Sequence, residues 1–522
     1  MMSLAPIVLA IALLALLSLA ALWSWGRFAH AARGKPSSAL PIAGSATGLD
    51  RLVQPLLDTR PEDESAAVLI DDALDAFLAR AHSARMAERS LDLQYYIWNH
   101  DLSGHLLDDE LLRAAERGVR VRLLLDDMNA AGKDPALLLL AEQPNIEVRL
   151  FNPARNRDAG LRRALEMGLR FVGFNRRMHN KAWIADNRLA IVGGRNVGDE
   201  YFGAARTNFR DTDLLLLGPA VAQASGIFDA FWNSDAVVPL RRLTPRRARI
   251  TLAQQETRQA EWQAQAAGSP WLAALHGHEQ WLTRTLQGAN LALHWSAHYQ
   301  VLSDPPEKAS PLRRRRDRAQ WLLYDVMALL FSARTHSRIM SPYFIPGEAG
   351  ALMISGQARR GVEVRVLTNS LAASDVPMVH AGYRKYRENL LRHGVRLYEL
   401  KPAAHRTSRA LVGASGASLH SKFIMVDGAR GFVGSFNFDP RSVQLNTEMG
   451  VLFDQPALAQ ALARFFDEST APELAWQVTQ SDAGALRWLD QTDTRHATEP
   501  QTRAGLRALV WLLGLLPLES QL

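Results

Sequence analysis

The chain has 522 residues, 48% of them hydrophobic and 22% charged, with a formal net charge of +7. This length exceeds what one hydrophobic core usually spans, so we expect two domains or two fused halves, and the composition is that of an ordinary globular protein rather than of a disordered chain. The lack of cysteine excludes disulfides, thiolate-zinc sites and a cysteine nucleophile. The positive charge suits anionic lipid surfaces and phosphate-bearing partners, nucleic acid included.

An uncharged apolar segment runs from Leu4 to Trp25. As a helix it would be about 33 Å long, which is enough to cross the hydrocarbon core of a bilayer. A cleaved signal peptide is the alternative, because Ala29 to Ala31 imitates a cleavage site, but the segment lacks a basic start and is long for such a peptide. We predict a transmembrane anchor over residues 1–26.

The rest of the chain contains an internal duplication. LDLQYYIW at Leu91 is followed by RGVRVRLLLDD, and IMSPYFIP at Ile339 is followed by RGVEVRVLTNS. Each copy reads as an apolar strand, an amphipathic helix ending at glycine and a second strand, the pattern of a βαβ unit. We predict two α/β halves over 61–245 and 291–478, a Gly- and Pro-rich linker over 27–60 and a connector over 246–290. In the tail, 479–522, the apolar segment 506–518 is too short to span a membrane, so it lies in an interface or packs on the protein.

One motif occurs in both halves, as HNKAWIADNRLAIVGGRN over 179–196 and as HSKFIMVDGARGFVGSFN over 420–437. Side chains alternate along a strand, so the histidine and the lysine two residues later share one face. The Asp-Asn and Asp-Gly pairs predict hairpin turns, the following small residues let backbone approach a ligand, and the asparagine amides suit phosphoryl oxygens. The first copy supplies His179, Lys181, Asp186, Gly194 and Asn196, and the second His420, Lys422, Asp427, Ser435 and Asn437.

A carboxylate follows each motif within an apolar strand. Asp213 lies 34 residues beyond His179, and Glu448 lies 28 residues beyond His420. A buried carboxylate needs a partner, and the second ring nitrogen of a histidine is a natural one, so we predict a histidine–carboxylate pair in each half. One histidine can then attack phosphorus while the other protonates the leaving alkoxide. The lysines and asparagines would offset the phosphoryl charge, so we expect neither a metal nor another cofactor.

Further candidates follow strands or precede the first motif. Asp126 ends a strand where open α/β sheets place ligands, although helix capping is as good an explanation. Asp375, His380 and Tyr383 follow the equivalent strand of the second half, where they contact a lipid headgroup or pack within a loop. The amphipathic segment LRRALEMGLRFVGFNRR, just before His179, either dips into a membrane or is an ordinary surface helix.

The paired motifs resemble the HKD motifs of the phospholipase D superfamily, and the resemblance extends from about Ser65 to Trp476. It implies two homologous halves, each a mixed β-sheet flanked by helices, related by a pseudo-two-fold axis. It further implies that His179 is the nucleophile and His420 the general acid. Asp186 and Asp427 then mainly hold the hairpins.

Within that superfamily, stretches such as RRMHNK, LTNSLAASDVPMVHAGY and GSFNFDPRS resemble the C-type cardiolipin synthases. This implies a bacterial inner-membrane enzyme that moves a phosphatidyl group from phosphatidylethanolamine or phosphatidylglycerol to phosphatidylglycerol through a phosphohistidine, with no need to oligomerise. Related synthases often carry two N-terminal spans, whereas this chain shows one. A phospholipase that uses water as acceptor is the main alternative. A nuclease is disfavoured because the basic runs lack interleaved aromatic residues, and a catalytically dead scaffold because both motifs are intact.

Overall fold

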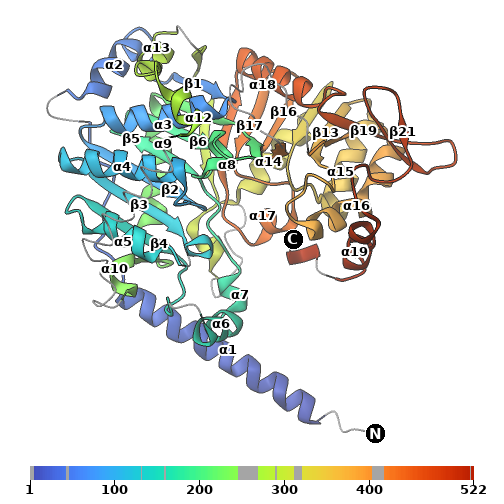
Figure 1. The fold of residues 1–522 in the computed structure, drawn as a ribbon, viewed down its shortest axis with the longest axis horizontal. Helices are drawn as coiled ribbons and strands as arrows, with labels where there is room; N and C mark the ends of the chain where they lie inside the picture. The colour runs from blue at the N-terminus through green and yellow to red at the C-terminus, as the bar shows by residue number, and fades with distance from the viewer. Residues whose placement is uncertain are drawn as a thin grey trace.

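The computed structural model describes residues 5–42, 46–130, 132–157, 160–244, 268–288, 291–310, 320–402, 417–517 and 519–521. Within the predicted connector, 246–290, residues 246–267 and 289–290 lie outside the described residues. Two β-sheets flanked by helices lie side by side, the N-terminal one on the left of Figure 1 and the C-terminal one on the right.

The first sheet has nine strands in the order β10-β1-β8-β6-β5-β2-β3-β4-β9. Its strands are β1 (Ser65–Ile70), β2 (Ser90–Tyr95), β3 (Arg120–Asp126), β4 (Ile146–Phe151), β5 (Ala182–Ala185), β6 (Leu189–Gly193), β8 (Asp213–Leu217), β9 (Val237–Pro239) and β10 (His294–Ser296). The helices of this half are α2 (Gly48–Leu57), α3 (Ala73–Met86), α4 (Leu102–Glu116), α5 (Asp134–Glu142), α6 (Leu161–Leu169), α7 (Phe171–Phe174), α8 (Asp199–Phe202), α9 (Pro219–Trp232), α10 (Leu240–Leu243), α12 (Pro270–Leu275) and α13 (Trp281–Leu286).

The second sheet has ten strands in the order β11-β18-β17-β16-β12-β13-β14-β19-β20-β21. Its strands are β11 (Tyr299–Ser303), β12 (His336–Met340), β13 (Glu363–Asn369), β14 (Arg396–Leu400), β16 (Phe423–Val426), β17 (Arg430–Gly434), β18 (Met449–Asp454), β19 (Ala475–Gln480), β20 (Leu486–Leu489) and β21 (Arg495–His496). The helices are α14 (Leu322–Phe331), α15 (Gly347–Arg359), α16 (Pro377–Arg392), α17 (Pro440–Gln444), α18 (Pro456–Ser469) and α19 (Ala504–Gly514).

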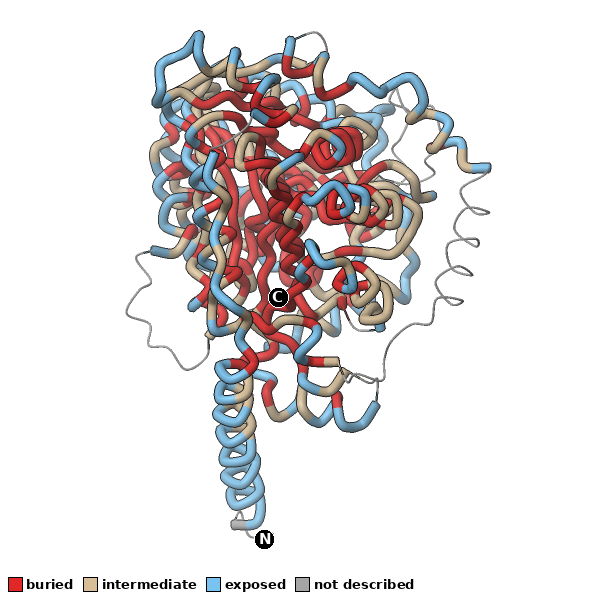
Figure 2. The backbone as a smooth tube through the Cα atoms, turned by 90° about the vertical axis from the view of Figure 1, so that its left-hand side faces the viewer, coloured by how far each residue is buried: buried red, intermediate tan, exposed pale blue. Residues whose placement is uncertain are grey.

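The two sheets repeat one topology. From β1 to β9, and from β11 to β19, the strands follow the same spatial order, with a parallel centre and antiparallel flanks. One buried cluster contains Leu216 and Phe228 from the first half together with Val433 and Phe466 from the second, so the halves share a hydrophobic core (Figure 2). The predicted α/β duplication is confirmed, and the shared core fixes one half against the other.

The segment expected to be a loose linker is folded onto the first half. The buried guanidinium of Arg149 donates to the carbonyl of Lys35 at 2.6 Å, and that of Arg122 donates to the carbonyl of Ser37 at 3.0 Å. Leu49 of α2 is fully buried. Buried guanidinium groups need acceptors, which this segment supplies, so the folded unit begins well before residue 61.

The two expected boundaries of the second half also differ from the structure. β10 lies after residue 291 but pairs with β1 of the first sheet. At the other end, β20 pairs with β19, and α19 buries Val510 against α16, so residues after 478 extend the second half. Both differences arise because a sheet edge is completed by whichever nearby segment can pair with it.

The N-terminal helix α1 (Ala5–Ala31) projects away from the body of the molecule (Figure 1). Among the described residues it is the one helix long and apolar enough to cross a membrane, with no part of its apolar window buried by protein. This agrees with the predicted anchor in length and composition.

Candidate active site

Each motif begins just before a β-hairpin, β5–β6 in the first half and β16–β17 in the second. The turn residues Asp186, Asn187, Asp427 and Gly428 all have positive φ, between 51° and 66°, as the predicted tight turns require. The carboxylates of Asp186 and Asp427 accept backbone N–H groups at the start of β2 and β12: Glu88, Arg89 and Ser90 in the first half, Arg334, Thr335 and His336 in the second. Both aspartates therefore tie their hairpin to the neighbouring strand.

The strand register shows which carboxylates correspond in the two halves. Gly193 pairs with Asp213, and its equivalent Gly434 pairs with Gly450. Counting back two residues makes Asp211 the counterpart of Glu448. The predicted equivalence of Asp213 and Glu448 is therefore wrong by two residues.

The histidine–carboxylate pairs cross between the halves. His179 Nδ1 lies 2.8 Å from Glu448 Oε2, and His420 Nδ1 lies 2.5 Å from Asp211 Oδ2. The prediction that each histidine pairs within its own half is wrong. Asp213 instead binds the guanidinium groups of Arg80, at 2.9 Å, and Arg195, at 3.4 Å.

Backbone pairing between the halves sets up this crossing. The N–H of His179 donates to the carbonyl of Thr447, and the N–H of His420 donates to the carbonyl of Arg210, both at 2.9 Å. Around the second contact, β7 (Asn208–Arg210) and β15 (Ala417–Leu419) form a parallel pair. Because Glu448 directly follows Thr447 and Asp211 directly follows Arg210, each carboxylate is delivered to the opposite histidine.

The small residues at the hairpin ends serve the carboxylates. A Cβ on Gly194 would lie 2.2 Å from Oδ1 of Asp211, so only glycine leaves room for that side chain. The Ser435 hydroxyl donates to Glu448 Oε2 at 2.5 Å, and that of Ser442 donates to Oε1 at 2.8 Å. Gly194 and Ser435 were predicted to contact a ligand. In this structure Gly194 makes room for the Asp211 carboxylate, and Ser435 donates to that of Glu448.

The charges of the site follow from burial and pairing. Burial raises the pKa of Glu448, but His179, together with Lys181 and the Ser435 hydroxyl, outweighs this effect and holds it below its usual value. The pKa of Asp211 is likewise about 2, because His420 outweighs burial. Burial lowers the pKa of His179 to about 4 and that of His420 to about 3. At neutral pH both imidazoles are uncharged, so each donates its Nδ1–H to an ionised carboxylate.

This arrangement leaves the other ring nitrogen, Nε2, with a lone pair. Across the part of the chain that the structure describes, neither Nε2 atom forms a hydrogen bond. The Tyr96 ring packs edge-on to His179, with centroids 5.0 Å apart, and Tyr201 packs in the same way on His420 at 5.1 Å. The sequence did not identify these two aromatic residues as site residues, although Tyr96 lies in the duplicated LDLQYYIW segment and Tyr201 lies five residues after Asn196.

The two lysines are buried beside the histidines. Lys181 Nζ donates to the carbonyl of His179 at 2.7 Å, and Lys422 donates to the carbonyl of His420. Burial lowers the pKa of Lys181 to about 7 and that of Lys422 to about 8. Each therefore has a protonation state that a nearby phosphate anion would shift towards the charged form.

The asparagines differ between the halves. The Asn196 amide donates to the hydroxyl of Tyr201 at 2.9 Å and accepts from the N–H of Ile97 at 3.1 Å. In the second half, Oδ1 of Asn437 is buried and has no hydrogen-bond partner among the described residues. Phosphate contact by the Asn437 amide stays a prediction, while Asn196 supports Tyr201 beside His420.

Asp126 and Asp375, which were also candidate site residues, differ in burial and in role. Asp126 is buried, pairs with Arg177 at 2.7 Å and accepts the N–H of Met178 at 2.9 Å, so it positions the segment before His179. Asp375 is exposed, accepts from the Tyr343 hydroxyl at 2.8 Å, and remains a candidate for headgroup contact.

His380 and Tyr383 belong to the interior of the second half. His380 Nε2 lies 3.0 Å from Glu499 Oε1, and Tyr383 is 2% exposed. Both residues lie on α16, which α19 covers. Of the two alternatives that the sequence left open, the structure favours packing over headgroup contact for these two side chains.

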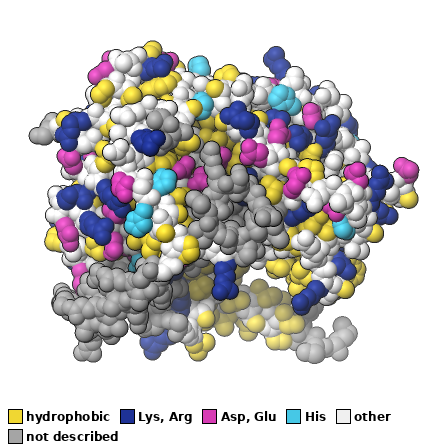
Figure 3. All heavy atoms as spheres, turned by 45° about the horizontal axis from the view of Figure 1, so that its top comes forward, with side chains coloured by type: hydrophobic (Ala, Val, Ile, Leu, Met, Phe, Trp, Pro, Cys, Tyr) yellow, Lys and Arg dark blue, Asp and Glu magenta, His cyan; other side chains and the backbone are white. Residues whose placement is uncertain are grey.

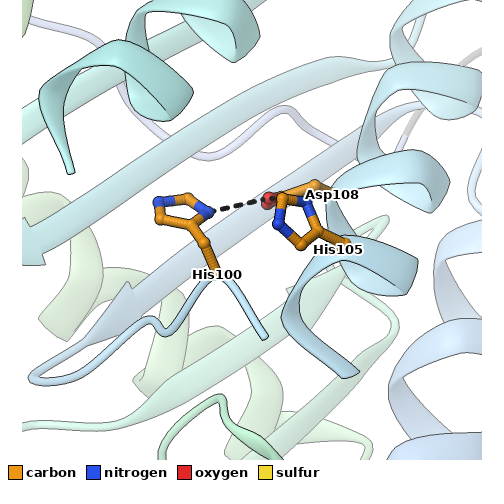
Figure 4. A group of neighbouring side chains, drawn as sticks. All are labelled: His100, His105 and Asp108. Carbon is orange, nitrogen blue, oxygen red and sulfur yellow. Dashed lines mark hydrogen bonds and ion pairs between the residues drawn. The ribbon is translucent and has the colours of Figure 1, made fainter. Parts of the chain in front are cut away.

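One group among the described residues has the composition of a metal site. His100, in the loop before α4, points its Nδ1 at Asp108 Oδ2, 3.2 Å away, and His105 lies beside Asp108 on the same helix (Figure 4). Asp108 Oδ1 already accepts from the Trp98 indole at 3.0 Å. Neither motif histidine belongs to this group.

The fold and the paired motifs define a phospholipase D-like protein. Residues 81–232 and 326–470 match the family described as "Cardiolipin synthase, PLD-like domain", and the chain belongs to this family. It is 42% identical to cardiolipin synthase C of Escherichia coli K12 over 86% of this chain and 94% of that protein. It is 27% identical to a cardiolipin synthase of Geobacillus kaustophilus over 82% of this chain and 71% of that protein.

One solved structure has the same fold. The phosphatidylserine synthase of Haemophilus influenzae superposes with a TM-score of 0.50 at 15% identity, covering 77% of this chain and 85% of that one. At this identity the likeness supports the two-half architecture.

Proposed function

We propose that this protein is a cardiolipin synthase that transfers a phosphatidyl group to phosphatidylglycerol through a phosphohistidine. The observation that carries the proposal is the pair of imidazoles, each held at Nδ1 by a carboxylate of the opposite half. A neutral imidazole with a fixed tautomer is a nucleophile at Nε2, and its protonated form is an acid at the same atom. Two such groups supply both functions that phosphodiester exchange needs.

In the first half-reaction, Nε2 of His179 attacks the phosphorus of the donor lipid. The bond from phosphorus to the headgroup oxygen breaks, and protonated His420 gives its Nε2 proton to the leaving oxygen. In the free protein His420 is neutral, but the phosphodiester anion and Asp211 both favour its protonated form once the donor binds. Lys181 and Lys422 would offset the charge on the phosphoryl oxygens.

In the second half-reaction, a hydroxyl of phosphatidylglycerol loses its proton to Nε2 of His420 and attacks the phosphohistidine. The P–N bond to His179 breaks, cardiolipin is released, and both histidines regain their starting states. With phosphatidylethanolamine as donor, the other product is ethanolamine; with phosphatidylglycerol, it is glycerol. The substrates and the apolar helix α1 together support a location in the bacterial inner membrane.

The face of the molecule seen in Figure 3 gives no support to nucleic acid as a substrate. On the face in Figure 3, lysine and arginine side chains are interspersed with acidic ones rather than gathered into a continuous basic groove. A nucleic-acid channel would require such a groove with stacking aromatic residues.

The test uses the purified full chain in vesicles that contain phosphatidylglycerol with or without phosphatidylethanolamine. We expect cardiolipin, with ethanolamine released only from the mixed vesicles if phosphatidylethanolamine is the donor, and no product from His179→Ala. Phosphatidic acid as the main product would show that water is the acceptor and would refute transfer.

A further inference from the structure

Four large apolar side chains are exposed within twelve residues of the first half. On α6 and α7, Leu161 is 85% exposed, Leu165 60%, Phe171 57% and Val172 61%. The opposite side of α6 is held by polar contacts, since Arg163 lies 3.4 Å from Asp127. Scattered exposed apolar residues are ordinary, but several gathered on two successive helices mark a surface that is covered in function.

The group lies where the anchor reaches the protein. Trp25 of α1 donates its indole N–H to the carbonyl of Pro153 at 2.9 Å, and the Arg170 guanidinium, between α6 and α7, stacks 4.3 Å from the Trp25 ring. From Pro6 to Trp25, α1 rises about 30 Å, the thickness of a hydrocarbon core. α6 therefore meets α1 near the level where α1 would leave a bilayer, and α7 directly follows α6 (Figure 1).

A second exposed apolar group lies on α19. Its members are Leu509, Trp511 and Leu512 on the helix and Leu515 and Leu516 after it, each 46–65% exposed. Gln521, near the end of the chain, accepts from Asn175, the residue after α7, at 2.8 Å. The end of the chain that follows α19 thus touches the end of α7.

We infer that α6, α7 and α19 form a second membrane contact, a docking face that lies in the interfacial layer of the leaflet from which α1 emerges. We expect a lipid surface to cover this face because the face adjoins α1, and no protein covers the apolar part of that helix. The inference extends the proposed function, since α7 ends at Phe174, five residues before His179. A lipid could then reach the histidines with its acyl chains still in the bilayer.

The chain contains no cysteine, so single cysteines can be introduced for labelling. Val172→Cys and Leu512→Cys probe the face, and Leu352→Cys on α15, 66% exposed, is the matched control. Each is labelled with an environment-sensitive fluorophore in the full chain and placed in vesicles of phosphatidylglycerol and phosphatidylethanolamine that carry a shallow spin-labelled lipid. We expect at least twofold quenching at 172 and 512 and little at 352. Equal quenching at all three positions would overturn the inference.

A charge variant tests what the contact does. Leu161→Glu, Leu165→Glu and Val172→Glu together should lower cardiolipin formation in vesicles at least tenfold, while Leu352→Glu with Phe331→Glu should not. Labelling of His179 by a short-chain donor in detergent should be the same in both. Full activity of the first variant in vesicles would refute the contact.

Disulfide cross-linking of Val172→Cys between copies in detergent would show a protein partner instead. Quenching without cardiolipin formation by the unaltered chain would reject the proposed function but leave the membrane contact standing.

Discussion

Nδ1 of His179 lies 2.8 Å from Oε2 of Glu448, although 269 positions separate the two residues in the chain. The reciprocal contact joins His420 to Asp211 across 209 positions. Each half thus contributes a histidine to one pair and a carboxylate to the other, and neither half contains a complete pair.

Glu448→Gln and Asp211→Asn should lower transfer roughly 100- to 10,000-fold, because an amide cannot stabilise the imidazolium that forms during the reaction. Asp213→Asn is the matched control, since Asp213 is equally buried but bound to arginines. It should mainly lower the free energy of unfolding, by about 3–5 kcal/mol. Cardiolipin formation and thermal unfolding, measured on all three variants, check this. A larger catalytic loss in folded Asp213→Asn than in Glu448→Gln would restore the pairing within each half.

His179→Ala and His420→Ala should differ in whether the protein can still be labelled by a donor lipid and in how they respond to an activated donor. Without the nucleophile, a phosphorus-labelled donor lipid should leave no label on the protein. Without the general acid, transfer should fall about 100- to 10,000-fold with an ordinary lipid, but much less with a nitrophenyl ester, whose leaving group needs little protonation. Rescue by the activated donor in His179→Ala instead would reverse the two roles and keep the two-histidine mechanism.

Asp186→Ala should destabilise the first hairpin, because the carboxylate accepts the N–H groups of Glu88, Arg89 and Ser90. Each buried donor left unpaired costs about 1–3 kcal/mol. Asp493→Ala is the control: Asp493 also has a positive φ, of 56°, but is exposed. We expect a much larger fall in melting temperature for Asp186→Ala, with unchanged labelling per folded molecule. Similar melting temperatures in both variants would contradict the structural role of Asp186.

Acid should weaken the contribution of the two site histidines to stability before their partner carboxylates, Glu448 and Asp211, titrate. The pKa of His179 is about 4 and that of His420 about 3 in the folded state, below the usual value near 6.5, so the unfolded state binds more protons between these values. The free energy of unfolding should therefore fall as pH drops from 6.5 to 5, by at most about 2 kcal/mol for each histidine. Denaturant titrations of the unaltered chain and of His420→Gln measure the effect. The variant should show a flatter profile, and an equally steep one would refute neutral, buried histidines.

The sequence predicted the duplication, the hairpin turns and the proximity of each histidine to its lysine, because these depend on local periodicity and turn chemistry. It could not separate Asp211 from Asp213. The two lie two positions apart in an extended segment, so alternation places both on one face. Only the pairing of Gly193 with Asp213 and of Gly434 with Gly450 distinguishes them. The folded linker was missed for a related reason, since the acceptors that Arg122 and Arg149 need are backbone carbonyls, which composition does not reveal.

The crosswise contacts also bear on ancestry. A single half with this strand order could assemble both pairs only as a two-fold symmetric dimer, in which each histidine would meet the carboxylate of the other copy. In such a dimer every substitution appears twice. Fusion into one chain releases that constraint, and the two halves differ at equivalent positions. Asp211 in the first half corresponds to Glu448 in the second, and Asp213, with its arginine partners, corresponds to Gly450. The halves could thereby specialise, one histidine towards nucleophilic attack and the other towards proton transfer, without losing the symmetry that brings them together.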